Sequence, residues 1–453
     1  MSESHPVIIL GAGLTGLSAG LHLGAVPSVV VEREAEVGGL CRTHAEDGFT
    51  FDCTGHLLHL RDEAIASLVD RLLPGAFQRH ERRALIFSKG VYTPYPFQAN
   101  LHGLPAAVVA ECVGGFVEAL VRREKEGEPD LARISFRAWC EAVFGRGIAE
   151  HFMVPYNSKL WRTDLDEIEC GWVSWSIPRP SLQEILGGAM GTTVRGLGYN
   201  PTFLYPRRGG ISVVPEALAR GCADLRLRET VVEIDAAART VRLASGALLS
   251  YQVLVSTLPL DRLLAIARNL PEDLPAAGRQ LRAVRVLNIS LGVDRPSLSG
   301  AHWIYFPEPE YSFYRVGFPA NLAEGLAPRG CSSLYVERSL LRDEPFDEGE
   351  VIARVVEDLR RCGLLWKGDR VVYHRVQILD PAYVIYDRFR AANLPRILEV
   401  LGALGIHSAG RFGAWEYNSM EGAMRAGLDL ATRLAPSLAG ALRPHRLSAG
   451  GGR

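Results

Sequence analysis

The stretch Val7-Ile8-Ile9-Leu10-Gly11-Ala12-Gly13-Leu14-Thr15-Gly16, close to the start of the chain, decides the fold. Its first four residues are an apolar run that predicts a buried parallel strand, and residues 17–23 predict a helix packed on the sheet. Between them, Gly11 allows a tight turn, Gly13 lets the backbone approach a pyrophosphate, and Gly16 lets the helix lie close to the strand. The N-terminus of this helix would bring free N–H groups and a positive dipole end to that pyrophosphate.

The residues after this helix indicate which dinucleotide is bound. A second apolar run, residues 28–31, ends in Glu32, about 20 residues after the first glycine, where an acid accepts hydrogen bonds from a ribose hydroxyl. Gly38, Gly39 and Arg42 follow. An acid followed by Gly-Gly and a basic residue resembles the extended fingerprint of FAD-binding oxidoreductases and mutases. A purely structural turn would not need the strand, the helix and the acid together, so we predict a dinucleotide site, and the Gly-Gly and basic residue favour FAD over NAD as the cofactor.

Bulk properties exclude several functional classes. A chain of 453 residues is too long for one simple core and predicts two or three joined domains. The formal net charge of -1 gives no general attraction to nucleic acid or to anionic membranes. The eight cysteines show no CxxC pair and no metal-ligand spacing, which predicts free thiols and no metal site. With no signal peptide and no apolar run near the roughly 18 residues of a membrane span, a cytoplasmic protein is expected. The oligomeric state is left open.

The order of apolar runs predicts the domain organisation. Strands and helices alternate at both ends of the chain, which predicts an α/β protein with a Rossmann-like FAD-binding domain. That domain is expected to be discontinuous, formed by residues 1–90, 200–260 and 405–440. Residues 100–190 are helix-rich and predict an inserted helical domain. Residues 280–400 contain short strands and predict a mostly antiparallel, substrate-binding sheet.

Two shorter segments carry local predictions. Residues 84–88 and 91–93 flank Lys89-Gly90 and predict a β-hairpin. Residues 202–210 contain a short apolar strand and are expected to return the chain to the sheet of the FAD-binding domain.

Two groups of candidate functional residues lie in the first half of the chain. His56 follows Gly55 directly after a predicted strand, and local sequence alone leaves a structural and a catalytic role open. Tyr156, Asn157 and Trp161 form a polar and aromatic cluster in a helical region. Because burial of the polar members is costly, this cluster is as compatible with a pocket lining as with a core.

Two further groups lie in the second half. Arg315 and Arg375 stand in otherwise apolar strands, near Tyr314 and Tyr383. A buried, unpaired guanidinium is costly, so each arginine needs a partner. A diphosphate held by both arginines and the tyrosine hydroxyls would supply one, and ordinary salt bridges are the alternative.

The fourth group opens the last long helix. It contains Gly410, Arg411, Met420 and Glu421. A turn of small residues at a helix N-terminus can offer N–H groups to a second phosphate or to the pyrimidine edge of a flavin.

In combination these motifs resemble the UDP-galactopyranose mutase family, the eukaryotic branch more than the bacterial one. The resemblance runs nearly end to end and rests on the FAD fingerprint, residues 95–98, 155–161, 200–203, 205–210, 313–315, 373–375 and 410–413, Tyr383, Trp415 and Tyr417.

The resemblance implies roles for individual residues. Tyr95 and Gln98 would hold a uracil base. His56 would lie beside the isoalloxazine. The diphosphate would be surrounded by Tyr314, Arg315, Arg375 and Tyr383, and the sugar or nucleotide pocket would be lined by Tyr156, Asn157, Trp161 and Asn200.

The activity implied is the interconversion of pyranose and furanose forms of a UDP-sugar without net oxidation. The resemblance implies that N5 of reduced FAD attacks the anomeric carbon of the sugar and forms a sugar adduct as UDP leaves. NAD(P)H is a candidate reductant of the flavin.

Two departures from the family lie next to the flavin. Residues 418–422 form a shorter segment than in the mutases, closer to amine and protoporphyrinogen oxidases, and Thr54-Gly55 replaces the usual Gly-Gly before the histidine. The alternative function is therefore an FAD-dependent oxidoreductase acting on an amine, a porphyrinogen-like compound or a sugar hydroxyl. A flavin-bound scaffold is disfavoured by the arginine and tyrosine set, and the sequence does not name the sugar.

Overall fold

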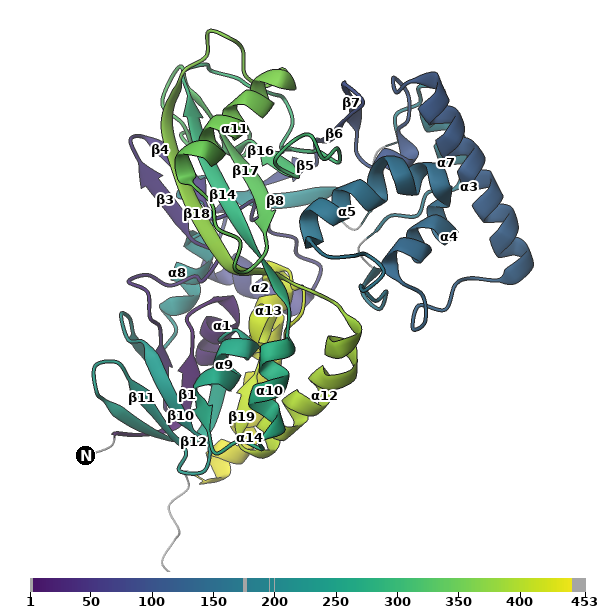
Figure 1. Ribbon diagram of the computed structural model, residues 1–453. Coiled ribbons are helices and arrows are strands. Elements are labelled where there is room, and N and C mark those ends of the chain that lie inside the picture. The colour runs from purple at the N-terminus through teal and green to yellow at the C-terminus, as the bar shows by residue number, and fades with distance from the viewer. Residues whose placement is uncertain (1–2, 174–176, 195, 199, 442–453) are drawn as a thin grey trace, which may run out of the picture.

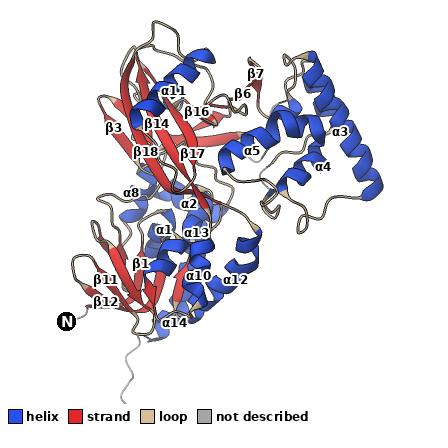
Figure 2. Ribbon diagram, viewed as in Figure 1, coloured by secondary structure: helices blue, strands red, loops and turns tan. Residues whose placement is uncertain are grey.

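The computed structural model describes residues 3–173, 177–194, 196–198 and 200–441. Three parts are visible in Figure 1: an eight-stranded sheet flanked by helices, a seven-stranded sheet above it, and a helical part at the right. Figure 2 shows the same division by colour, with the two sheets in red and the third part almost entirely in blue. The predicted α/β class with an inserted helical part and an antiparallel sheet is confirmed.

The first strand lies inside the eight-stranded sheet. β1 (Glu3–Leu10) pairs in parallel with β12 (Leu248–Ser256) on one side and β2 (Ser28–Val31) on the other. The apolar run of β1, residues 7–10, is fully buried, as its composition predicts. The remaining strands are β9 (Asp224–Arg226) beside β2, β19 (Ile406–Ser408) on β12, and an outer ribbon of β11 (Thr240–Leu243), β10 (Val231–Asp235) and β13 (Ala267–Arg268).

The last helix packs on the first. Thr15 Oγ1 of α1 (Leu14–Leu23) donates to Ala423 O at 2.9 Å, in α14 (Met420–Ala441). Ser18 Oγ donates to Met424 O at 2.6 Å. A Cβ at Gly427 would lie 2.4 Å from Thr15 O, so the two backbones touch where only glycine fits. The C-terminal segment therefore completes the nucleotide-binding part.

The seven-stranded sheet is antiparallel except where β15 (Trp303–Tyr305) pairs with β6 (Ala84–Ser88). Its order is β18 (Val371–Val384), β14 (Ala283–Val293), β17 (Ser332–Leu340), β16 (Arg315–Gly317), β15, β6 and β7 (Val91–Pro94). The hairpin predicted around Lys89-Gly90 is confirmed, with φ of 52° and 81° at the two turn residues. Helix α11 (Glu348–Arg361) shares a core cluster with β14 and β17. β6 and β7 also belong to this sheet. The predicted boundaries of the FAD-binding, helical and substrate-binding domains stay a prediction.

The helical part is tightly packed. A Cβ at Gly145 of α4 (Phe136–Ile148) would lie 2.1 Å from Gly115 O of α3 (Ala106–Glu126). The other helices here are η1 (Phe97–Ala99), η2 (Ala149–Met153), α5 (Val154–Trp161) and α7 (Leu182–Ala189).

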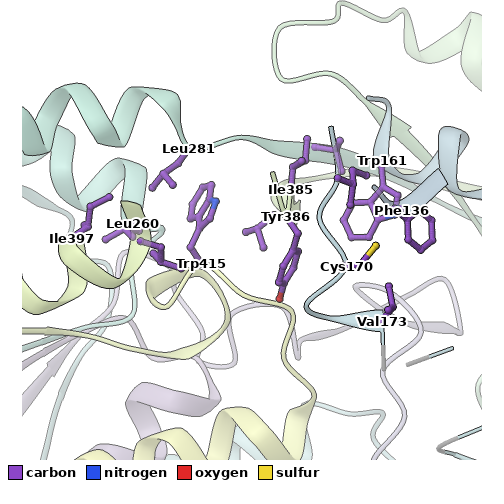
Figure 3. Packing of buried hydrophobic residues seen from close by; sticks show 14 of the residues in the cluster. Phe136, Trp161, Cys170, Val173, Leu260, Leu281, Ile385, Tyr386, Ile397 and Trp415 are labelled. Carbon is purple, nitrogen blue, oxygen red and sulfur yellow. The ribbon is translucent and has the colours of Figure 1, made fainter. Parts of the chain in front are cut away.

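One hydrophobic cluster connects this part to the nucleotide-binding part. Figure 3 shows Trp161 and Phe136 at one end of the cluster and Trp415 toward the other, beside Leu260 and Ile397, with Ile385 and Tyr386 between Trp161 and Trp415. The helices around the Trp415 end are α9 (Leu260–Ile266), α10 (Asp273–Gln280), α12 (Arg388–Ala403) and α13 (Gly410–Gly413). The helical part is therefore fastened to the rest of the molecule by a continuous core.

Two small two-stranded sheets complete the fold. β3 (Thr43–Glu46) pairs with β4 (Phe49–Asp52), and β5 (Phe77–Glu81) pairs with β8 (Thr202–Pro206). The expectation that residues 202–210 rejoin the main sheet is wrong. β8 pairs with β5 instead, because Phe203 and Tyr205 are buried against the β5–β6 side of the molecule. The remaining short elements are α2 (Glu63–Leu72), α8 (Val213–Ala219) and η3 (Pro319–Asn321).

All eight cysteines lie in described segments and are free. Within the described ranges, no helix is long and apolar enough to cross a membrane.

A buried carboxylate joins β4 to β8. Asp52 accepts hydrogen bonds from Tyr205 Oη at 2.7 Å, Thr43 Oγ1 at 2.6 Å and Ile211 N at 3.0 Å. Burial raises the pKa of Asp52 to about 6, although these hydrogen bonds favour its charged form.

We predict that Asp52→Asn flattens the pH dependence of stability. Because the pKa of Asp52 is higher in the folded than in the unfolded chain, its contribution to stability is full below about pH 4 and is lost as the pH rises through about 6. Between about pH 4.5 and 7.5 the parent should lose roughly 2 kcal/mol more of its free energy of unfolding than the variant. Denaturant unfolding of both proteins across this range measures the difference. Parallel curves would contradict the assignment.

Candidate active site

A cavity of about 900 Å³ lies where the two large sheets meet. At one end it is lined by the turn after β1, and at the other by residues of β16, β17 and β18. The carboxyl ends of the parallel strands β1, β2 and β12 face it, which is where α/β sheets bind their ligands.

The three fingerprint glycines meet three different surroundings. Gly11 has φ of 97°, and a Cβ there would lie 2.3 Å from Thr257 Oγ1. A Cβ at Gly16 would lie 2.0 Å from Gly11 O, so this glycine sets the distance between α1 and β1. A Cβ at Gly13 would meet no protein atom within 4 Å and would project into the cavity. The fold requires the first and third glycines, whereas the second leaves room for a ligand.

The other fingerprint residues surround the same end of the cavity. Glu32 accepts Ala12 N at 2.7 Å and Glu34 N at 3.0 Å, one on each carboxylate oxygen. Gly38 N donates to Ala12 O at 2.8 Å, and a Cβ on Gly39 would lie 3.4 Å from Gly13 Cα. Glu32, Gly38, Gly39 and Arg42 line the cavity. The open space at Gly13 and the carboxylate beyond it fit the pyrophosphate and ribose of a dinucleotide such as FAD.

The C-terminal segment forms the opposite wall. Gly410 has φ of 80°, and a Cβ there would lie 2.5 Å from Thr15 Oγ1, so α13 approaches the start of α1 closely. Arg411 and Met420 line the cavity. Glu421 is not among the described lining residues, because its carboxylate accepts from Arg61 N and Asp62 N and holds the turn before α2.

Four polar side chains form one row across the second sheet. Arg315, Glu337, Asn288 and Gln377 are direct cross-strand partners on β16, β17, β14 and β18, so they share a face. Asn288 Nδ2 donates to Cys53 O at 2.6 Å, and Gln377 Nε2 donates to Cys53 Sγ at 3.4 Å. This polar row thereby holds the loop that carries His56.

His56 lines the cavity beside two arginines. Burial, with Arg411 and then Arg315 contributing, lowers the pKa of His56 to about 4, so its imidazole is neutral at neutral pH. Thr54 Oγ1 lies 3.3 Å from His56 Nδ1. A Cβ at Gly55 would lie 2.1 Å from Tyr335 Oη, so the glycine before the histidine makes space for the tyrosine.

Arg315 and Glu337 form a buried ion pair. Arg315 Nε donates to Glu337 Oε2 at 2.9 Å, and Nη2 donates to Oε1 at 2.6 Å. Tyr314 Oη adds a third donor to Oε2 at 2.6 Å. Burial alone would lower the pKa of Arg315, but Glu337 and nearby tyrosines raise it well above its usual value. The guanidinium is therefore charged and fixed in direction.

Of the two arginines predicted to converge on a diphosphate, only Arg315 faces the cavity. Arg375 lies opposite Ser290 of β14, two residues along β18 from Gln377 of the polar row. Three strand spacings, roughly 14 Å, also separate β18 from β16, which carries Arg315. Arg375 lies instead near His44, whose pKa is lowered by burial and by this arginine. Arg375 is absent from the described lining residues, so the geometry does not support its predicted role.

Among the other predicted substrate residues, Asn200, Tyr314 and Tyr383 line the cavity. Asn200 Nδ2 lies 3.0 Å from His59 Nε2. The described lining residues do not include Tyr95, Gln98, Tyr156, Asn157 and Trp161.

Three of these five residues, Tyr95, Tyr156 and Trp161, contact aromatic rings that line the cavity. Gln98 Nε2 donates to Pro178 O at 2.8 Å, and Trp161 Nε1 donates to Asn157 Oδ1 at 3.2 Å. The rings of Tyr95 and Tyr156 contact that of Tyr305, which does line the cavity. Their roles in binding a substrate stay predictions.

Residues that sequence reasoning missed include Glu337, Gln377, Tyr305 and Tyr335, all of which line the cavity. Glu337 had a detectable signal. It is an acid inside an apolar strand, and like Arg315 it is a charged residue that needs a partner when buried.

Arg411 follows Gly410 at the nucleotide end, and its guanidinium extends to the end of β18, where no acid among the described residues pairs with it. Its Nη1 donates to Asn418 O and its Nη2 to Ala382 O, both at 3.0 Å. Its Nε is buried without a partner, and no salt bridge to it occurs within the described part of the chain. The rings of Tyr383 and Tyr417 are parallel, with centroids 6.4 Å apart, and the Arg411 guanidinium lies 5.3 Å and 4.7 Å from them.

Comparisons with known proteins agree with this geometry. A family model described as flavin containing amine oxidoreductase matches residues 14–435. The crystal structure of a reduced UDP-galactopyranose mutase is similar over 96% of this chain and 94% of that chain, with a TM-score of 0.90 and 28% identity.

More distant structures share the fold alone. A putative protoporphyrinogen oxidase from Exiguobacterium sp. 255-15 has a TM-score of 0.72 at 16% identity, over 96% of this chain and 99% of that chain. A double mutant of putrescine oxidase has a TM-score of 0.68 at 16% identity, over 96% of this chain and 100% of that chain.

A short sequence match was also found. An inactive all-trans-retinol 13,14-reductase of Danio rerio is 43% identical over 49 residues, which are 10% of this chain and 8% of that protein.

Substituting the second and the third fingerprint glycine should have opposite effects. Gly13→Ala places a methyl group in the open cavity, so we expect the flavin-stripped protein to keep its stability while most of the flavin is lost. Gly16→Ala drives a methyl group into Gly11 O and should destabilise the stripped protein by roughly 1–3 kcal/mol. Flavin absorbance per protein and thermal unfolding of the stripped proteins separate the two effects. A Gly13→Ala protein with a full complement of flavin would show that the cofactor lies elsewhere.

Proposed function

We propose that this chain, which belongs to the family of flavin-containing amine oxidoreductases, is a flavin-dependent mutase. Its proposed reaction is the interconversion of pyranose and furanose forms of a UDP-sugar. The observation that carries this proposal is the charge of the cavity beyond the nucleotide end. There Arg411 has no acidic partner among the described residues, and Arg315 presents its remaining edge. Such a site attracts an anion such as a diphosphate. The likeness to a reduced UDP-galactopyranose mutase supports the same substrate class.

Bound FAD, in its reduced form, would supply the nucleophilic electron pair of this chemistry, with NAD(P)H as a candidate reductant. The protein's own residues bind and orient the substrate. Arg315 Nη1 would donate to the diphosphate and stabilise its negative charge as it departs. His56, neutral at working pH, would hydrogen-bond a sugar hydroxyl without adding charge. The aromatic wall of Tyr305, Tyr335 and Tyr383 would exclude water from the reacting centre.

The alternative, oxidation of an amine, fits this cavity less well. Two parallel tyrosine rings such as Tyr383 and Tyr417 are a suitable place for an ammonium group. Here the guanidinium of Arg411 already lies over both rings. A substrate ammonium would meet a like charge, whereas a phosphate would meet an opposite one.

The test is turnover by reduced protein. We expect dithionite-reduced, FAD-loaded protein to convert UDP-galactose or another UDP-hexose or UDP-pentose to its furanose form, and the oxidised protein to be inactive. Chromatography of the nucleotide sugars measures both. Absence of furanose product from the whole panel would remove the mutase proposal. Anaerobic bleaching of the oxidised flavin by an amine, a porphyrinogen or a sugar would establish the oxidoreductase alternative.

Replacing Arg315 should separate substrate binding from folding. Arg315→Ala removes charge-assisted donors and should lower UDP affinity about 10- to 100-fold, as measured by calorimetry. It also leaves Glu337, which is 1% exposed, without its counter-ion, so a loss of roughly 3–5 kcal/mol in stability is expected. Arg315→Lys should restore only part of the affinity, because an ammonium cannot keep the two-bond contact with Glu337 that orients the rest of the group toward the cavity.

Two controls make this result interpretable. The double variant Arg315→Met, Glu337→Gln removes both charges and should recover stability without recovering UDP affinity. Arg375→Ala, on the same sheet but off the cavity, should bind UDP like the parent. UDP affinity unchanged in Arg315→Ala would place the diphosphate elsewhere.

A further inference from the structure

The guanidinium of Arg315 has two unequal edges. Its Nε–Nη2 edge is fully used by Glu337, in the parallel two-bond arrangement that a phosphate would otherwise occupy. Its Nη1 has no hydrogen-bond partner within the part of the chain that the structure describes. Two of its five N–H groups are used by Glu337, so an anion in the cavity reaches Arg315 through the Nη1–Nη2 end, directly beside the carboxylate.

Glu337 itself is held from both sides. Tyr314 Oη donates to the same Oε2 that accepts from Arg315 Nε. Burial, and then Glu337, raises the pKa of Tyr314 well above its usual value, so the hydroxyl keeps its proton and remains a donor. With three charge-assisted hydrogen bonds and 1% exposure, the carboxylate does not swing away to release Arg315.

The resulting charge at this end of the cavity is smaller than the arginine content suggests. Glu337 cancels Arg315, His56 is neutral, and Arg411 supplies the remaining positive charge. Glu337 also lines the cavity, so its carboxylate acts on a bound anion directly and through Arg315.

We propose that Glu337 is a specificity-determining residue that lowers the affinity of this cavity for anions in proportion to their charge. The inference rests on the proposed function for the identity of the substrate, a diphosphate ester. It explains how the departed UDP can still dissociate from the cavity. The cavity holds the diphosphate through the Nη1–Nη2 end of Arg315, beside the Glu337 carboxylate. It disfavours small, highly charged anions, which would bind most tightly to an arginine that has no acid beside it.

The test is a series of probes of increasing charge. Uridine, UMP, UDP and inorganic pyrophosphate are titrated by calorimetry into FAD-loaded parent and Glu337→Gln protein. Glutamine keeps the size of the side chain and one acceptor while removing the charge. We expect uridine affinity to be unchanged, UMP affinity to rise a few-fold, and UDP and pyrophosphate affinities to rise roughly tenfold or more. Glu337→Asp keeps the charge and should keep the weak pyrophosphate binding.

Glu308→Gln is the matched control. It also removes a buried carboxylate near this sheet, 7% exposed and bonded to Ser88 Oγ, but outside the cavity. Its affinities should equal those of the parent. Should Glu337→Gln fail to fold, Glu337→Ala provides the second neutral variant.

Equal or weaker pyrophosphate binding in a folded, flavin-loaded neutral variant overturns the proposal. So does a uniform gain for all four probes, because a structural loosening would not depend on charge. Pyrophosphate contains neither sugar nor base, so this result is independent of whether UDP-sugars are turned over. Failure of the furanose assay would defeat the proposed function, and failure of the charge series would defeat the role of Glu337.

Discussion

The close approach of helix α1 to its neighbours is the constraint on which the rest of the structure depends. At Gly16 the helix touches the turn after β1, at Gly410 the segment after β19 touches Thr15, and at Gly427 helix α14 touches the backbone of α1. A Cβ at any of these positions would lie 2.0–2.5 Å from another atom. Three glycines, one near the N-terminus and two near the C-terminus, therefore bring both ends of the chain to one end of the cavity. That contact leaves the N-terminus of α1 open toward a pyrophosphate.

The second sheet supplies the polar and charged side chains at the end of the cavity away from the nucleotide fingerprint. Two members of its polar row, Asn288 and Gln377, hold the loop of His56, and three members, Gln377, Arg315 and Glu337, line the cavity. Direct cross-strand partners contact one another along the row. The row therefore connects the loop of His56 to Arg315.

The family fold does not determine the reaction. Similar folds occur in a mutase, a putative protoporphyrinogen oxidase and a putrescine oxidase. In this chain the charge of the cavity depends on a few side chains: a guanidinium over two tyrosine rings, a second guanidinium paired with an acid, and a neutral histidine. Together they favour an anionic substrate over a cationic one, which is why the electrostatics of the site carry the functional argument.

The sequence by itself determined the features that depend on local chemistry. Residues 7–16 specify a strand, a turn and a helix within one short segment, so the nucleotide-binding element is readable without a partner. The Lys89-Gly90 hairpin and the strands of the second sheet are readable for the same reason. The tertiary structure decided everything that depends on which strands become neighbours. Sequence reasoning required a partner for Arg315, but only the pairing of β16 with β17 identifies Glu337 as that partner. The same pairing places Arg375 three strands away, because side chains near each other in a sheet are set by register across strands and not by similarity of their local sequence.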